Sequence, residues 1–352
     1  MTITLDPTRT PVRTAFGPNR FTSAMGTGIV ANAAATLGVP GLRGPATVVW
    51  AAAAVLLVVL CAAWARRWRE VRADDPVMAQ FWGAPPIALV TVGAGALLLG
   101  KDWIGLGPAL TLDWALWTAG TVFGLVTAVR IPYRMMTALD VAPGSAFGGW
   151  LLPVVPPMVS AAGGAALIAH LPDGGFRLGM LLACAAMVGV SVLATLVVLP
   201  QLRQRLVHHR IGAAGVPTTW IVLGALGQSI AAVNLLGDET TAVLPEPYGP
   251  AGAVVGLFYG VPVWGFALLW LALAAALTLR TARRGLPFSV AWWSFTFPLG
   301  ALVSGTNALA ARVHSGLFTG TATALYALLV AVWATVVVRT VLALRRPAEP
   351  VQ

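Results

Sequence analysis

Apolar residues follow one another along this chain in runs of about 18 or more, separated by short polar segments. Runs of this length cross the hydrocarbon of a bilayer as α-helices. An open sheet would leave backbone groups unpaired in lipid, and the alternating ten-residue strands of a β-barrel are absent from the sequence. The pattern predicts an all-α integral membrane protein with ten spans, near residues 21–38, 47–65, 81–99, 111–129, 148–170, 178–199, 219–236, 251–279, 289–310 and 321–338.

Two kinds of span alternate, which indicates five successive helical hairpins. The even spans are almost wholly aliphatic, whereas the odd spans, which begin at intervals of 60 to 71 residues, collect Pro, Gly and small polar residues. Proline inside a span frees carbonyl groups that neighbouring helices or cavity water must satisfy. We therefore expect an inner ring of five kinked helices around an axis, sheathed by five straighter ones, with Pro262 as an exception in an even span. The alternative is close helix packing through small residues.

Composition agrees with a membrane location. Apolar residues make up 58% of the chain and charged residues 10%, whereas soluble domains carry about 25% charged residues. We expect a cytoplasmic segment over residues 1–16, a ten-span domain over 17–343 and a cytoplasmic tail over 344–352. The first sixteen residues have no apolar core, so no removable signal peptide is predicted.

The basic residues lie mainly on one side of this topology. Of the 22 Lys and Arg residues, 18 fall in the N-terminus, every second loop and the C-terminus, and the other four are Arg43, Lys101, Arg177 and Arg312. By the positive-inside rule both termini are cytoplasmic, in a bacterial cytoplasmic membrane. Topology thus accounts for the net charge of +10 without a nucleic-acid partner.

Residues that could carry catalysis are sparse. An ionisable side chain in mid-membrane is costly and usually functional, and we predict none there. The candidates fall at predicted span ends or in a loop: Asp113, Arg130, Asp140, His170, His208 and His209. A membrane enzyme, which would depend on His208 or Asp140, remains an alternative. A sensor or scaffold is disfavoured because no extramembrane domain would relay a signal.

Neither a metal nor a cofactor is expected. No His pair has the spacing of a zinc or haem site, and no glycine-rich loop joins a strand to a helix. Cys61 and Cys184 both fall within apolar spans, where a thiol usually acts as a small hydrophobe. The prediction is a protein that is not an enzyme.

Permeation is the function that remains. A path lined by hydroxyl, amide and backbone groups, without a carboxylate ring, suits anions better than cations. The candidate lining residues come from the odd spans: Gly26, Thr27, Gly28, Ser160, Ser229, Gly300, Ala301, Ser304 and Asn307.

Phe297 is the distinctive residue of the ninth span. Gly300, Ala301 and Ser304 follow it at helical spacing, so Phe297 is the one bulky side chain on a small, polar face. If that face lines the axis, the ring would plug the pore, because hydrophobic constrictions gate by excluding water. The alternative is an aromatic side chain packed between helices.

Two motifs resemble a known family. FSVAWWSFTFPLGAL, residues 288–302, is similar to a ninth-span motif of the plant slow anion channels, and RFTSAMGTGIVANAAATLG, residues 20–38, resembles the first span of the tellurite-resistance/dicarboxylate transporter family. That family also includes fungal malate permeases and sulfite efflux pumps. The resemblance implies five hairpins in a quasi-fivefold arrangement, with the odd helices lining a central pore. It also implies a homotrimer with one pore in each protomer, and a Phe gate directly before a Pro, which is Phe297 here.

These observations lead to one functional prediction. We expect transport of small anions, such as a C4-dicarboxylate, sulfite, chloride or nitrate, through a pore gated by Phe297. A proton-coupled malate or dicarboxylate carrier, or a sulfite exporter, on the same fold is the alternative.

Overall fold

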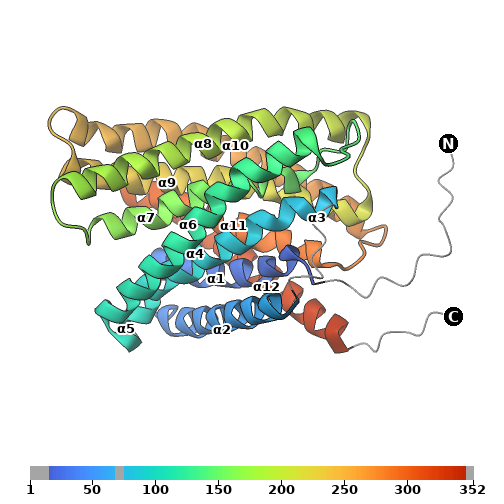
Figure 1. The fold of residues 1–352 in the computed structure, drawn as a ribbon, viewed down its shortest axis with the longest axis horizontal. Helices are drawn as coiled ribbons and strands as arrows, with labels where there is room; N and C mark the ends of the chain where they lie inside the picture. The colour runs from blue at the N-terminus through green and yellow to red at the C-terminus, as the bar shows by residue number, and fades with distance from the viewer. Residues whose placement is uncertain (1–15, 68–74, 346–352) are drawn as a thin grey trace.

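The computed structural model describes residues 16–67 and 75–345, and every regular element in them is helical. The predicted N-terminal segment lies outside the described residues except for Phe16, and so does most of the predicted C-terminal tail. Long helices lie side by side along the longest axis of the molecule, and the chain enters its first inner helix at the same end at which its last outer helix finishes (Figure 1).

Five inner segments correspond to the odd predicted spans. They are α1 (Phe21–Leu37), α4 (Ala84–Gly95), α7 (Pro156–Ile168), α9 (Ile221–Val243) and α11 (Thr296–Val313). α4 continues a short α3 (Pro76–Gln80) and runs on through a π-helical turn, η4 (Ala96–Gly100), into α5 (Lys101–Ile104). The windows around α4 and α9 are 83% and 89% buried. These segments form the core of the molecule.

Five longer helices correspond to the even spans and cover the inner segments. They are α2 (Arg43–Arg67), α6 (Leu106–Thr137), α8 (Gly175–His208), α10 (Tyr248–Ala282) and α12 (Gly316–Arg345). Their apolar windows are 11% to 33% buried, so most of their hydrophobic surface faces outward. Such surface is stable only in lipid, and the chain is therefore a multi-pass membrane protein.

The inner segments close a ring. α1 contacts α4 and α11, α7 lies between α4 and α9, and α9 contacts α11. Each outer helix packs on the inner segment of its own hairpin and on the next one around the ring, for example α2 on α1 and α4. The five predicted hairpins and their ring arrangement are confirmed.

Span length differs between the two sets. By length and composition, seven helical stretches within the described residues could cross a membrane alone. The other three predicted spans are α1, α7 and α11, with 17, 13 and 18 residues. Each of these helices begins after a 3-10 turn: η1 (Pro18–Arg20), η5 (Gly148–Leu151) or η7 (Val290–Phe295). The same device precedes α4, as η3 (Phe81–Gly83), and α9, as η6 (Ala213–Trp220). All five inner segments thus break at the same end.

Glycine allows α9 and α11 to approach closely. A Cβ added to Gly227 would lie 2.5 Å from the carbonyl carbon of Ala301, and one added to Gly305 would lie 2.5 Å from the carbonyl oxygen of Gly227. Small residues at helix crossings let backbones touch, which is a main source of packing energy between helices in lipid.

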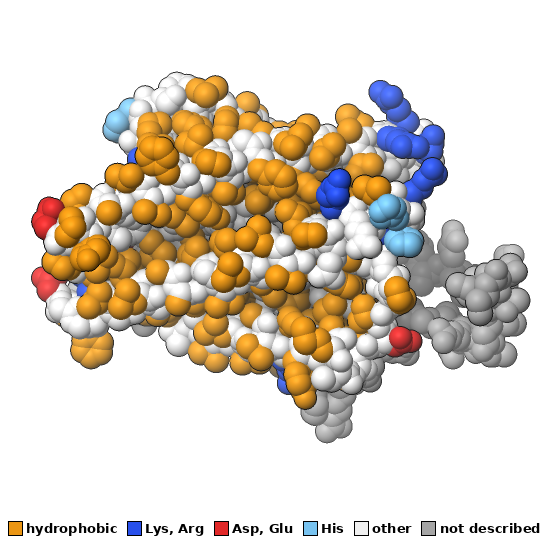
Figure 2. All heavy atoms as spheres, turned by 90° about the horizontal axis from the view of Figure 1, so that it is seen from above, with side chains coloured by type: hydrophobic (Ala, Val, Ile, Leu, Met, Phe, Trp, Pro, Cys, Tyr) orange, Lys and Arg blue, Asp and Glu red, His pale blue; other side chains and the backbone are white. Residues whose placement is uncertain are grey.

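Charge separates along the long axis. Basic side chains gather at one end of the molecule (Figure 2), the end at which α1 begins and α12 ends (Figure 1), and we call it the arginine-rich end. At the opposite end, cations are paired with acids at 2.6 Å: Arg43 with Asp102, Arg177 with Asp173, and Arg312 with Asp238.

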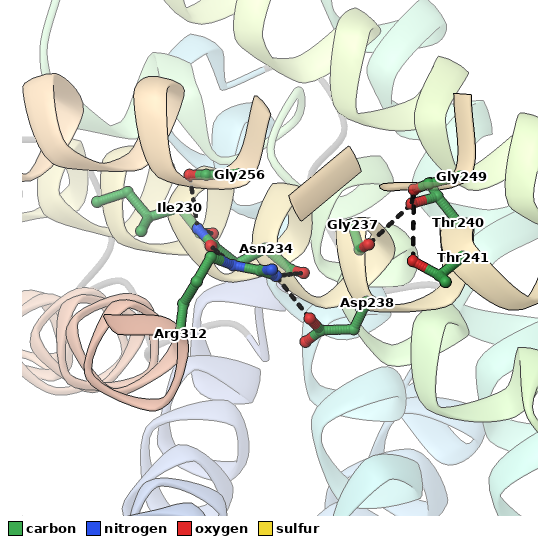
Figure 3. A network of polar contacts seen from close by, with 9 residues as sticks. All are labelled: Ile230, Asn234, Gly237, Asp238, Thr240, Thr241, Gly249, Gly256 and Arg312. Atoms are coloured by element: carbon green, nitrogen blue, oxygen red, sulfur yellow. Dashed lines mark hydrogen bonds and ion pairs between the residues drawn. The ribbon is translucent and has the colours of Figure 1, made fainter. Parts of the chain in front are cut away.

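Arg312 is the most enclosed of these cations and ties three helices together (Figure 3). Its guanidinium, from α11, donates to the side-chain oxygen of Asn234 at 2.8 Å and to the backbone carbonyl of Asn234 at 2.7 Å, on α9. The amide of Asn234 donates in turn to the carbonyls of Ile230 at 2.9 Å and Gly256 at 3.0 Å, the latter on α10. The network fixes the ends of α9, α10 and α11.

Gly227→Val is expected to destabilise the protein by about 1–3 kcal/mol or more, because the new side chain forces the α9 and α11 backbones apart. The measurement is thermal unfolding of the purified protein in detergent. Gly189→Val on α8 is the matched control, since an added Cβ there meets no atom within 4 Å. Equal unfolding temperatures for the two variants would contradict the close crossing.

Arg312→Gln is expected to cost about 1–3 kcal/mol of stability, because acceptors of the network lose their donor in a partly buried place. Arg43→Gln should cost less than about 1 kcal/mol, since the Arg43 side chain is 51% exposed. Denaturant or thermal unfolding of both variants checks the difference. A larger loss for Arg43→Gln would refute the role given to Arg312.

Candidate functional site

A small cavity lies where the five inner segments meet. Its volume is about 10 Å³, and it receives side chains from all five of them. The lining residues are Thr22, Met25, Ile87, Leu152, Val155, Ile221, Gly224, Ser294, Phe297 and Pro298. Because the inner segments form a closed ring, this cavity marks the ring's axis.

One residue from each hairpin forms what we call the axial ring: Met25, Ile87, Val155, Gly224 and Phe297. Each lies within or next to the first turn of its helix. A second layer lies three residues earlier, at Thr22, Leu152, Ile221 and Ser294. Positions three apart share one face of a helix or 3-10 turn. The repeated hairpins therefore place equivalent residues around the axis.

Phe297 is the largest member of the axial ring and Gly224 the smallest. The Phe297 side chain is 2% exposed. A cavity of about 10 Å³ is close to the lower limit for one water molecule, so the axis is closed to a hydrated ion in this structure. The walls are mainly apolar, with hydroxyl groups only from Thr22 and Ser294 among the lining side chains.

The inner helices all point the same way. An outer helix runs back between consecutive inner segments, so the N-termini of α1, α4, α7, α9 and α11 meet at the arginine-rich end, next to the axial ring. A helix N-terminus carries a partial positive charge, although here the first N–H group of α1, α4, α9 and α11 already donates to a carbonyl of the preceding 3-10 turn. None of the five first turns contains an acidic residue. The electrostatics of this end of the axis favour anions.

None of the other nine predicted lining residues is on the wall of this cavity. A Cβ at Gly26 would collide with Thr296, one at Gly28 would lie 2.9 Å from Thr91, and one at Gly300 would lie 2.6 Å from Ile29. These three glycines occupy crossings of α1 with α11 and α4. Ala301 packs at the crossing of α9 and α11 described above.

The polar candidates point in several directions. Thr27 accepts a hydrogen bond from the indole of Trp333, on α12, at 3.2 Å. Ser229 and Ser304 donate to carbonyls of their own helices, at 2.8 Å and 3.1 Å. Ser160 Oγ is buried and has no hydrogen-bond partner among the described residues. Asn307 donates to the carbonyl of Thr36 at 2.7 Å. Their part in permeation stays a prediction.

Asp113 lies deeper in its helix than the sequence analysis places it. The predicted span begins at residue 111, whereas α6 begins at Leu106, so Asp113 lies two turns inside the helix. It is 1% exposed, and neither carboxyl oxygen has a hydrogen-bond partner among the described residues. It faces α4, where a Cβ on Gly93 would lie 2.8 Å from Oδ1. By contrast Asp140, His170 and His208 are exposed.

Sequence reasoning found Phe297 but missed the rest of the axial ring. Met25, Ile87 and Val155 are ordinary apolar residues in apolar spans, and Gly224 is one small residue among many in the odd spans. These residues share one feature that the sequence could reveal: each lies just after the 3-10 turn at the start of its odd span. Aligning the five hairpins at those turns would have identified them.

A closed ring of broken inner helices inside a lipid-facing sheath is compatible with a membrane transport protein. Comparison with known proteins then gives the family. A family model described as a voltage-dependent anion channel (SLAC1) matches residues 15–341, and the chain belongs to this family. The predicted resemblance is confirmed, and the protein is of the anion channel and transporter class.

Relatives cover most of the chain. It is 28% identical over 346 residues to the sulfite efflux pump SSU1 of Arthroderma otae, across 93% of this chain and 90% of that protein. It is 27% identical over 323 residues to SSU1 of Trichophyton rubrum, across 86% and 84%. It is 26% identical over 336 residues to an uncharacterized transporter of Methanocaldococcus jannaschii, across 92% of each.

Proposed function

We propose that this protein conducts small anions along the axis of the inner ring and that Phe297 is the gate. The observation that carries the proposal is the position of Phe297: its side chain closes the axial ring at the point where five helix N-termini meet. Membership of the anion channel family supports it. Sulfite is the first anion to test, since two relatives are sulfite efflux pumps. C4-dicarboxylates, chloride and nitrate are the next.

The proposed mechanism uses the electrostatics of the helix ends and the size of one side chain. Helix N-termini free of acidic residues stabilise an anion before the constriction. The Phe297 ring keeps the narrowest level too small and too apolar for water, which excludes a hydrated ion. Movement of this ring toward Gly224, where the axial ring has no side chain, would open the path. No covalent step is involved.

Orientation follows from charge. The arginine-rich end faces the cytoplasm by the positive-inside rule, and the axial ring then lies toward the cytoplasmic side of a bacterial inner membrane. Anions leaving the cell would meet the helix N-termini first. A homotrimer with one path in each protomer remains part of the proposal.

A second function, a proton-coupled carrier, is favoured by Asp113 alone. A buried carboxylate without a hydrogen-bond partner is very unfavourable in lipid, so the neutral, protonated form is preferred there. Among the elements packed on α6, the segments α3, η3, α4, η4 and α7 have no titratable side chain, and α5 has Lys101 and Asp102, both exposed. Asp113 could thus hold a proton beside an inner helix. Coupling would require that proton to be exchanged during transport.

Phe297→Ala is expected to raise voltage-driven anion flux into liposomes by at least tenfold, because it removes the side chain that closes the axial ring. Phe295→Ala is the matched control: Phe295 is also buried, at 6% exposure, but packs on Trp220 and Trp292 instead of the axial cavity. It should leave flux at the wild-type level.

A double variant makes this test stricter. Gly224 lines the same axial cavity as Phe297, from α9. A Phe at position 224 would place a ring at the same level of the axis, so the double variant with Phe297→Ala and Gly224→Phe should return flux toward the wild-type value. Unchanged flux in a folded Phe297→Ala protein, or equal stimulation by Phe295→Ala, would refute the assignment of Phe297 as the gate.

Asp113→Asn separates channel from coupled carrier. For a carrier, a pH gradient alone should drive sulfite or malate uptake in the wild type, and the Asn variant should lose that response while keeping exchange of labelled anion. For a channel, the pH gradient has no effect on wild-type uptake at constant voltage and the variant behaves like the wild type. Radiolabelled uptake at clamped voltage measures both.

A further inference from the structure

A large hollow opens between α2 and α12 on the lipid-facing side of α1. Its volume is about 890 Å³, near the upper end of the range of about 300–1,000 Å³ for ligand pockets. We call it the lateral groove. It is separate from the axial cavity, since no residue lines both.

Two outer helices form the apolar walls of the lateral groove. On α2 the lining residues are Ala52, Leu56 and Leu60, and on α12 they include Val337 and Val341. Members of each set are four residues apart, so each set is one face of its helix. The α2 set extends over about 12 Å and the α12 lining, Trp333 to Leu344, over about 16 Å at 1.5 Å per residue. These lengths suit an extended hydrocarbon chain.

One end of the lateral groove is polar. Arg20, Asn19, Ser23 and Asp75 line it there, beside the N-terminus of α1. Within the described residues Arg20 forms no ion pair, and its guanidinium carbon lies 5.6 Å from the centre of the Phe16 ring. Asp75 Oδ1 accepts backbone hydrogen bonds from Val77 at 2.8 Å and Met78 at 3.1 Å, which cap α3. Among the described residues, Arg20 is therefore a cation without an acidic partner at the polar end of the lateral groove.

We propose that the lateral groove binds one glycerophospholipid, with its phosphate at Arg20 and an acyl chain between α2 and α12. A cation at the polar end and an apolar trough running toward mid-membrane match the two parts of such a lipid in order and orientation. Phospholipid is also the solvent of this face, because the neighbouring α2 residues Val55 and Val58 are 64% and 67% exposed. The site does not depend on the anion proposed for the axis.

The bound lipid would contact segments that also bear the axial ring. Trp293 lines the lateral groove, donates from its indole to Thr340 on α12 at 3.2 Å, and precedes Phe297 by one turn. Ser23 and Thr27 face the groove from α1, whereas Thr22 and Met25 of the same helix face the axis. The lipid would thus support the outer side of the wall that holds Met25 and Phe297.

Native mass spectrometry of the delipidated full chain, titrated with palmitoyl-oleoyl phosphatidylglycerol, tests the site without any flux measurement. The wild type should bind one lipid in clear preference to further ones. Leu56→Trp and, independently, Val337→Phe should reduce that first binding at least fivefold by filling the groove from either wall. Val58→Trp, on the exposed face of α2, is the matched control and should bind as the wild type does.

Arg20→Gln tests the headgroup contact and should also reduce first binding at least fivefold, with partial recovery in Arg20→Lys. Equal binding by all folded variants would overturn the site. A loss in the two wall variants but not in Arg20→Gln would overturn the phosphate assignment. If the wall variants instead changed the oligomeric state and left lipid binding intact, the groove would hold a second copy of the chain, and the lipid proposal would fall.

Discussion

A bilayer offers no partner to a free backbone N–H or C=O group, and this constraint decides where each kind of helix lies. The inner segments are interrupted by 3-10 turns and by prolines, so they contain backbone groups outside regular α-helical pairing. Five long helices enclose them and keep those groups away from lipid. The breaks can therefore lie at one level around an axis. A single span exposed to lipid could not contain such a break, because its free backbone groups would have no partner.

The direction of the inner segments is a second consequence of the hairpin order. Each inner segment is followed by one returning outer helix, so all five N-termini meet at one end. Their partial charges add, and the absence of acids from the first turns leaves them uncompensated. At the other end, arginines form ion pairs with aspartates and hold helices together, as in the Arg312 network (Figure 3). The two ends of the axis therefore differ in electrostatics as well as in shape.

Where the structure shows the contacts of small residues in the inner segments, these residues let neighbouring helices pack closely. Gly26, Gly28 and Gly227 each lie where an added Cβ would strike a neighbouring helix. Close packing lets the axial ring remain narrow, since only the side chains of Met25, Ile87, Val155 and Phe297, with Gly224 at the fifth position, are left to occupy the centre.

The sequence alone determined the membrane class, the ten spans and the alternation of broken and regular helices, because hydropathy and helix-breaking residues act locally. It also singled out Phe297, since one helical face and one motif both pointed to it. Other features needed the tertiary structure. Met25, Ile87 and Val155 look like any apolar residue until five hairpins are brought around one axis. Asp113 lies two turns inside α6, because packing against α4 lets that helix start earlier than hydropathy indicates. The lateral groove joins residues of α1, α2 and α12 from opposite ends of the chain. Periodicity gives the faces of a helix, but only packing decides which face meets the axis, a neighbour or lipid.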